Sequence, residues 1–126
     1  NLDRLIKSLS AVLDDGLFVF VTSKDDLTRL NLTARMTFQE AEGTTYIIPK
    51  SQAETHGLAY EFPCRMITLN IHSSLEAVGF MARITTELAK HDMGVNPVSG
   101  FFHDHLFVPD GREADAMAVL LEMSKG

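Results

Sequence analysis

Several short stretches of the chain carry the apolar pattern of β-strands. Residues 34–40 and 65–72 alternate apolar with polar side chains, which is typical of a strand with one buried face. Residues 17–21 are apolar throughout, so we expect a strand that is buried on both faces. Residues 34–40 with 44–48, and residues 95–102 with 105–108, each predict a hairpin.

Turn signals separate these predicted strands. Asp15-Gly16 precedes the fully apolar strand, and Glu42-Gly43 and His103-Asp104 stand inside the two hairpins. Residues 23–31 are polar and predict a loop or one weak helical turn.

The spacing of apolar residues also predicts helices. The longest runs from about Glu76 to His91 and ends at Gly94. Shorter helices are expected at residues 2–9 and 51–56. A last helix is expected after Asp110, which would form a capping box with Glu113. The apolar face expected for the longest helix comprises Val78, Met81, Ala82, Thr85, Leu88 and Ala89. The face expected for the last helix comprises Ala114, Met117, Ala118 and Leu121.

The chain contains a faint internal repeat. The stretch Ile47–Glu54 is echoed by Phe107–Ala114, and each copy is a short apolar run stopped by proline and followed by a polar start of a helix. Each copy also follows a predicted strand and turn, so we infer two related halves, residues 1–62 and 63–126. Both approximate a ferredoxin-like βαββαβ plan, with the first helix of the first half almost deleted.

The expected fold class is therefore α+β, with antiparallel sheets and helices on one face. In this plan Pro97 lies on an edge strand, where a missing N–H costs no ladder hydrogen bond. The second half lacks its final strand. Either the chain ends before that strand, or the first strand of the other half supplies it.

Composition narrows the class of protein. A chain of 126 residues with 45% hydrophobic residues can bury a core. The formal net charge of −6, with scattered Lys and Arg, argues against nucleic acid as a partner. The longest apolar run is too short to span a bilayer, so no membrane is expected. Cys64 is the single cysteine, which is typical of the reducing cytoplasm.

The segment from Ile71 to Ile84 resembles the strand-to-helix loop of ACT domains. That loop carries an acidic residue, a spacer, proline and glycine, and these positions correspond to Glu76, Ala77, Val78 and Gly79. The stretch His91–Asn96 matches the end of the following helix. Together with residues 37–44 and 103–109, these motifs make nearly the whole chain similar to a small bacterial family of tandem ACT-like proteins.

The resemblance implies a small-molecule site, most simply for an amino acid. The N–H groups of the first helical turn, with Gly79 in that turn, would seat a carboxylate. Ser73 and Ser74 would cap the helix or contact the ligand beside Val78, and Glu76 would meet a cationic group. The plainer alternative is that Ser74 is the N-cap and Gly79 relieves packing.

The strand Asn96–Gly100 would complete this site with free backbone groups at a sheet edge, so Asn96, Ser99 and Gly100 are candidate contacts. Alternatively, the edge pairs with a second subunit as a homodimer. The segment 103–109 also resembles the corresponding segment of eukaryotic arginine-sensing tandem ACT proteins. This resemblance implies that Asp104 would contact the cationic end of the ligand.

Two polar clusters have alternative interpretations. The cluster His103-Asp104-His105, with His72, is a candidate metal site, although Asp and His are also ordinary turn residues. Glu40 and Glu42 are expected to be solvated turn carboxylates or to meet a ligand ammonium across the two halves. Phe101-Phe102 is expected in the core or at a dimer contact.

These observations favour a non-catalytic regulatory or sensor module without a cofactor. A ligand-free oligomerisation or interaction module is the first alternative. A metal-dependent enzyme that uses His103, Asp104 and His105 is the second.

Overall fold

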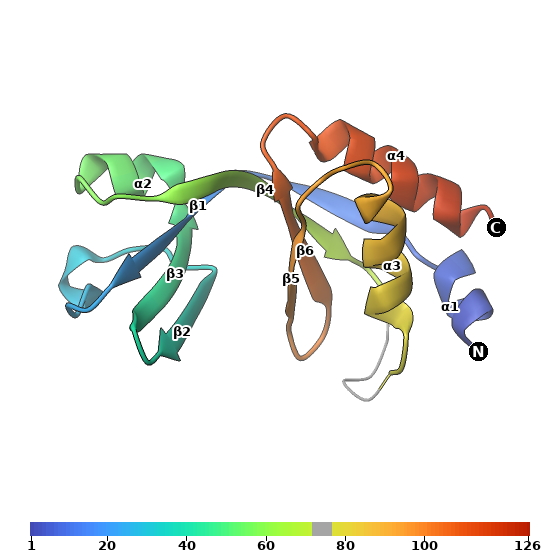
Figure 1. The fold of residues 1–126 in the computed structure, drawn as a ribbon, viewed down its shortest axis with the longest axis horizontal. Coiled ribbons are helices and arrows are strands. Elements are labelled where there is room, and N and C mark those ends of the chain that lie inside the picture. The colour runs from blue at the N-terminus through green and yellow to red at the C-terminus, as the bar shows by residue number, and fades with distance from the viewer. Residues whose placement is uncertain (72–76) are drawn as a thin grey trace. The chain divides into compact units, whose positions relative to one another are not determined.

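The computed structural model describes residues 1–71 and 77–126. In chain order, the elements of these residues are α1 (Leu2–Lys7), β1 (Ala11–Ser23), the 3₁₀ helix η1 (Thr28–Leu30), β2 (Met36–Glu40), β3 (Gly43–Pro49), α2 (Lys50–Thr55), β4 (Glu61–Leu69), α3 (Phe80–Ala89), β5 (Asn96–Ser99), β6 (Asp104–Pro109) and α4 (Glu113–Ser124). Figure 1 shows their arrangement. The predicted helices and hairpins are all present, so the α+β assignment is confirmed.

The strands form an antiparallel sheet. Hydrogen-bonded neighbours follow the order β2-β3-β1-β4-β6-β5, and the β1–β3, β2–β3 and β5–β6 pairs are antiparallel. Contacts divide the chain into unit 1, residues 1–15 with 65–126, and unit 2, residues 16–64. The predicted boundary between residues 62 and 63 stays a prediction.

Unit 1 obtains its outer strand from the beginning of the chain. Its strands follow the order β1-β4-β6-β5, in which residues 11–15 of β1 lie beside β4. The Asn70 N–H donates to the Ser10 carbonyl at 2.7 Å, and the Arg65 guanidinium donates to the Asp14 carbonyl at 2.9 Å. These contacts run antiparallel. The final strand of the second ferredoxin-like plan is thus supplied by the chain's first strand.

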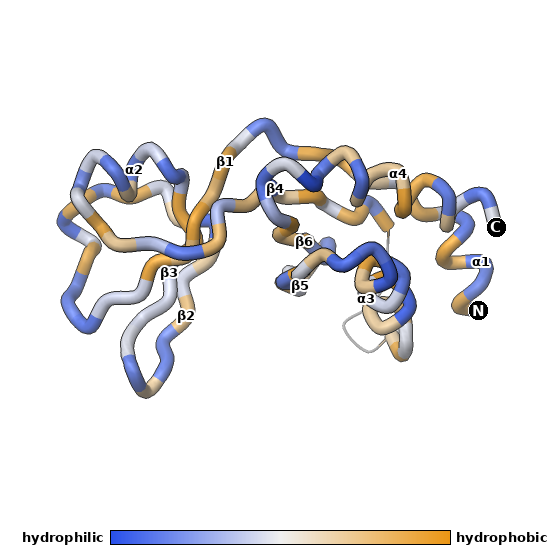
Figure 2. Tube along the Cα trace, turned by 45° about the horizontal axis from the view of Figure 1, so that its top comes forward, coloured by the Kyte–Doolittle hydropathy of each residue, from blue (hydrophilic) through white to orange (hydrophobic). Residues whose placement is uncertain are grey.

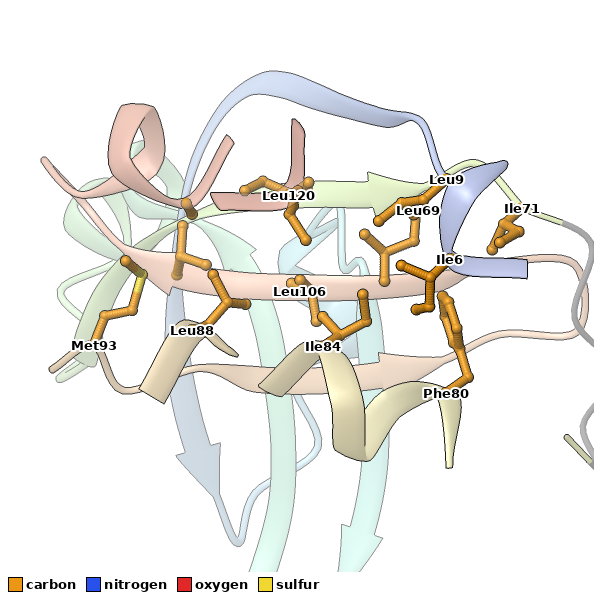
Figure 3. Packing of buried hydrophobic residues seen from close by; sticks show 13 residues of the cluster. Ile6, Leu9, Leu69, Ile71, Phe80, Ile84, Leu88, Met93, Leu106 and Leu120 are labelled. Atoms are coloured by element: carbon orange, nitrogen blue, oxygen red, sulfur yellow. The ribbon is translucent and has the colours of Figure 1, made fainter. Parts of the chain in front are cut away.

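The core of unit 1 lies between the sheet and three helices. Ile67 and Leu69 of β4 and Leu106 of β6 face the helices, and Figure 3 shows the side chains of α1, α3 and α4 converging on them. Full burial of each such aliphatic side chain contributes about 1.5–3 kcal/mol. Packing on one face of the sheet therefore fixes the positions of all three helices. The helical members of the core are Ile6, Phe80, Ile84, Leu88, Ala116 and Leu120.

The buried faces of two helices differ from the prediction. In α3 the buried residues are Phe80, Ile84 and Leu88, because the helix begins after Gly79 and not at Glu76. Of the predicted face, Leu88 alone is fully buried, while Met81 and Thr85 are half-buried. Val78, Ala82 and Ala89 are exposed.

In α4 the buried residues are Ala116 and Leu120. Of the predicted face, Met117 is half-buried, whereas Ala114, Ala118 and Leu121 are exposed. Apolar residues occur on every side of α4, so spacing alone cannot select the face that packs. The predicted capping box is also absent, since the N-cap is Arg112 and makes no side-chain capping bond.

Unit 2 packs α2 and the loop after β1 against β1 and β3. Its core comprises Val19, Val21, Leu27, Ile48 and Ala53. Two expectations for this unit are wrong. Asp15-Gly16 is not a turn, because β1 runs through it, and β2 is not half-buried, since Phe38 is 62% exposed. In Figure 2 the connection between β2 and β3 is mostly hydrophilic.

None of the helices in the described residues has both the length and the apolar character needed to cross a membrane.

Candidate functional site

The first part of the predicted site is the start of α3. Gly79 is the N-cap residue, with φ of 84°, and its carbonyl accepts the Arg83 N–H at 3.0 Å. The prediction that Gly79 lies in the first helical turn is therefore wrong, because Gly79 precedes that turn. Val78 is 89% exposed. Ser73, Ser74 and Glu76, like His72, lie outside the described residues, so their ligand roles stay predictions.

The start of α3 lies at the end of unit 1 where β4 ends. In Figure 3 Phe80 lies near Ile71 and Ile6, whereas Leu88 and Met93 lie at the opposite end of the core. Helix α3 thus runs back along β4, as the ferredoxin-like plan requires. The four free N–H groups at its first turn consequently face the same end of the unit.

The first residues of β6 reach this same end. Thr68 Oγ1 of β4 lies 2.9 Å from His105 Nδ1 of β6, so these two residues lie side by side on the neighbouring strands. Asp104, next to His105, is half-buried and lies beside the last residues of β4. Asp104 is also the register partner of Ser99 on β5. The fold therefore gathers Gly79, Ser99 and Asp104 at one end of unit 1.

Asn96 is not part of this group. It begins β5 and pairs with Phe107, three residues from Ser99. At about 3.3 Å per strand residue, the two side chains are separated by roughly 10 Å along the edge. β5 is the edge strand, as Pro97 predicted, so its outer backbone groups have no sheet neighbour among the described residues.

Gly100 closes the connection between β5 and β6. Its N–H donates to the His103 carbonyl at 2.9 Å. A Cβ atom at this position would lie 3.1 Å from that carbonyl oxygen and 3.6 Å from His105 Nε2. Gly100 therefore keeps the turn tight and holds Asp104 at the start of β6. Its role in the structure is geometric, whether or not it also contacts a ligand.

Phe101 and Phe102 lie in this turn. They are 79% and 71% exposed, and their rings meet edge to face with centroids 5.0 Å apart. The part of the prediction that placed them in the core is wrong.

The histidine cluster does not assemble a metal site within the described part of the chain. No group of three His, Cys, Asp or Glu side chains is close enough there to hold an ion. His105 contacts Thr68, and His103 belongs to the turn. On the other hairpin, Glu40 accepts a hydrogen bond from the Thr45 hydroxyl across the β2–β3 ladder.

Sequence reasoning missed a groove on the helical side of unit 1. It has a volume of about 850 Å³ and lies between α1, α3 and α4, with Ile6, Val119 and Met123 among its lining residues. The signal that could have revealed it is the apolar character of α4 on every side.

Charged groups near the start of α4 are also ordered. The backbone N–H groups of Glu113 and Gly111 donate hydrogen bonds to the Glu113 carboxylate, and Arg65 lies nearby. These contacts lower the pKa of Glu113, although partial burial acts in the opposite direction. In unit 2, hydrogen bonds from the Thr28 N–H and hydroxyl lower the pKa of Asp26. Both carboxylates stabilise local turns.

Two protein-family models match consecutive parts of the chain. One ACT-domain model matches residues 1–65, and a second ACT-domain model matches residues 61–122. The chain belongs to the ACT domain family. ACT domains are regulatory modules that bind small molecules and are not themselves catalytic, and the matches support a regulatory module of this kind. This confirms the tandem ACT resemblance.

Solved structures agree with the ACT fold. A protein of unknown function from Vibrio cholerae, described as a possible transport protein, is 36% identical, with a TM-score of 0.90 over 98% of this chain and 95% of that one. A protein from Agrobacterium tumefaciens shares 10% identity, with a TM-score of 0.77 over 92% and 89% of the two chains.

The regulatory subunit of aspartate kinase from Thermus thermophilus also shares the ACT fold. It is 9% identical, with a TM-score of 0.66, and the match covers 90% of this chain and 95% of that one. No protein with a curated description matches the chain.

Proposed function

We propose that this ACT-domain protein is a cytoplasmic sensor that binds an amino acid at the end of unit 1 where α3 begins. Three groups of known chemistry at that end support the proposal: the N–H groups of the first turn of α3, the Asp104 carboxylate and the edge of β5. A helix N-terminus favours a carboxylate, and Asp104 favours an ammonium or other cationic group. This pairing of opposite charges at one end of the unit carries the proposal.

Ser99 would contribute a hydroxyl beside Asp104, and the predicted loop residues Ser73, Ser74 and Glu76 would complete the site. Asn96 is too far along β5 to contact the same small ligand. The open edge of β5 would pair with a second copy in a homodimer, so that ligand binding at the end of that edge biases the assembly.

One observation favours the alternative of a ligand-free interaction module. A Cβ atom at Gly79 would lie 3.5 Å from Leu2 Cδ2, so a side chain of α1 already occupies space beside the start of α3. In this alternative Gly79 serves the backbone turn, and the exposed Phe101-Phe102 pair serves protein contacts.

Thermal unfolding in the presence of each common amino acid at millimolar concentration separates the two functions. A ligand at a hundred times its Kd adds about 2.7 kcal/mol to the free energy of unfolding, which raises Tm by about 10 °C in a domain of this size. We expect one amino acid, or a chemically related group, to give such a shift.

The site is tested with Asp104→Asn, and Asp110→Asn is the matched control because Asp110 is exposed at the other end of β6. Asp104→Asn should abolish the ligand-induced shift, while Asp110→Asn should retain it. Absence of a shift with every amino acid would instead favour the interaction module. If the ligand still raises the Tm of Asp104→Asn, it binds elsewhere than at this end of unit 1.

A further inference from the structure

Helix α1 lies against the beginning of α3. A Cβ atom on Gly79 would lie 3.5 Å from Leu2 Cδ2, so the first residue of α1 lies directly beside the N-cap of α3. The Arg83 guanidinium, about one turn further along α3, forms an ion pair with Asp3 at 3.4 Å. Two successive residues of α1 therefore contact the first part of α3.

This contact lies where the proposed carboxylate seat begins. The N–H groups in the first turn of a helix have no partner within the helix and point out of its N-terminal end. Leu2 lies at that end, beside Gly79, and its apolar side chain cannot accept a hydrogen bond from these groups. A carboxylate that takes the place of Leu2 can accept such bonds.

In the part of the chain that the structure describes, few contacts hold α1 in this position. Ile6 is the one buried residue of the helix, and Leu2 and Leu5 are half-buried. In Figure 3 Ile6 lies beside Phe80 of α3. A helix of six residues is too short to be stable by itself. Burial of Ile6 therefore favours the observed position, and the remaining contacts add little.

The ion pair between α1 and α3 is one of these weak contacts. The side chains of Arg83 and Asp3 are 44% and 77% exposed. Water and salt screen such a pair, so its contribution to stability is small. The ion pair can therefore open without a large loss of stability.

The residues that follow α1 are fixed more firmly. The helix ends at Lys7 with Ser8 as its C-cap. Leu9 is buried, and the Ser10 carbonyl accepts the Asn70 N–H at 2.7 Å. Helix α1 can therefore move about Ser8 while the strand that follows it stays in the sheet.

We propose that α1 is an intramolecular lid on the amino-acid site, closed in this structure and displaced when the amino acid binds. The inference rests on the function proposed above, because the lid regulates that same site. The amino acid binds only the open form, so its apparent Kd rises with the fraction of closed molecules. Binding in turn releases Leu2 and Leu5 from unit 1.

The test uses the full chain and each common amino acid at millimolar concentration. The amino acid that raises Tm most is then titrated calorimetrically to obtain its Kd. Leu2→Ala and Leu5→Ala each remove half-buried packing of α1, and both should lower this Kd about three- to tenfold. Arg4→Ala is the matched control, since Arg4 is exposed on the same helix, and it should change the Kd by about twofold or less.

The pair of leucine variants separates a lid from a wall of the site. Leu5 has no atom within 4 Å of a Cβ placed on Gly79, whereas Leu2 does. If Leu2 were a wall that contacts the amino acid, Leu2→Ala would raise the Kd and Leu5→Ala would leave it unchanged.

Amide hydrogen exchange gives a readout that a purely structural role of α1 would not change. On addition of the amino acid, exchange at residues 5–8 should become faster, because the open form exposes them. Exchange at residues 80–82 should become slower, because the bound carboxylate accepts their N–H groups. The opposite change in α1, slower exchange on binding, would overturn the lid.

The remaining outcomes distinguish the lid from the sensor function. A Tm shift with the same Kd in the wild type and both leucine variants would overturn the lid and leave the sensor function intact. A Tm shift that appears only in Leu2→Ala and Leu5→Ala would support a lid that is closed in nearly all wild-type molecules. No Tm shift in the wild type or in either variant would overturn the sensor function, and the lid with it.

Discussion

Arg65 Nη1 on β4 lies 3.2 Å from Glu113 Oε2 at the first turn of α4. The other end of the same guanidinium donates to the Asp14 carbonyl of β1, and the second oxygen of Glu113 accepts the Gly111 N–H at 2.7 Å. One half-exposed ion pair therefore joins two strands to the start of α4. Because Ala116 and Leu120 of α4 belong to the core of unit 1, this junction helps to hold a helix on which that core depends.

Acid should weaken this junction first. The pKa of Glu113 is lowered in the folded protein from an ordinary value of 4.5. A carboxyl with a lowered pKa stabilises the fold at pH values above its unfolded pKa, and that stability is lost as pH falls through the folded pKa. We expect Glu113→Gln to lower the free energy of unfolding by up to about 1 kcal/mol at pH 7 and to flatten its decline below pH 4.5.

Urea unfolding of both proteins between pH 7 and pH 3 measures this effect. Glu122→Gln is the control, because Glu122 is exposed on the same helix and no ion pair of its side chain is found in the described residues. Parallel pH curves for the wild type and Glu113→Gln would show that the junction contributes no pH-dependent stability.

Gly79 should be required for its backbone conformation. Its φ of 84° lies in the left-handed region, where a Cβ atom costs about 1–2 kcal/mol. Gly79→Ala should therefore lower the free energy of unfolding by about that amount. Gly79→Asn should lose less, because Asn tolerates this conformation better than Ala does. Chemical unfolding of the three proteins without added ligand gives the comparison, and a variant Gly79→Ala as stable as the wild type would contradict it.

Gly100 should be required for space. A Cβ atom there would press on the His103 carbonyl at 3.1 Å, so we expect Gly100→Ala to cost about 1 kcal/mol. Gly94→Ala is the control, since a Cβ atom at Gly94 meets nothing within 4 Å and its φ is not left-handed. That change should be neutral or stabilise by about 0.4–1 kcal/mol, through the reduced freedom of the unfolded chain. Equal stabilities of the two variants would mean that the turn adjusts freely.

The sequence predicted the elements better than their faces. Alternation along residues 65–72 and the position of Pro97 correctly indicated β4 and an edge strand, because strand patterns and proline act locally. The face of α4 was wrong because both of its sides are apolar, and the choice between them depends on which side meets β6. The start of α3 was misplaced because Gly79 is the N-cap and has a left-handed φ, which the spacing of apolar residues does not reveal.

For the candidate site, sequence reasoning grouped residues that the fold brings together only in part. Ser99 and Asp104 were brought together because they are paired across a hairpin, a local relationship. Asn96 was grouped with them as a neighbour along the same short strand, although its side chain lies toward the other end of that edge. The helical groove is formed by three elements far apart in sequence, so the apolar character of α4 could indicate an open face but could not by itself locate the groove.

Strand β1 also sets the order in which the protein can be completed during synthesis. Its first residues, Ala11–Asp15, leave the ribosome early but belong beside β4, whose residues 65–69 are made much later. The remainder of β1 can pair with β3 in the meantime. Closure of so long a loop costs entropy and slows folding. Until β4 has been made, the first residues of β1 therefore have no strand partner in unit 1. The sheet of unit 1 is thus completed when later strands pair with a strand made before them.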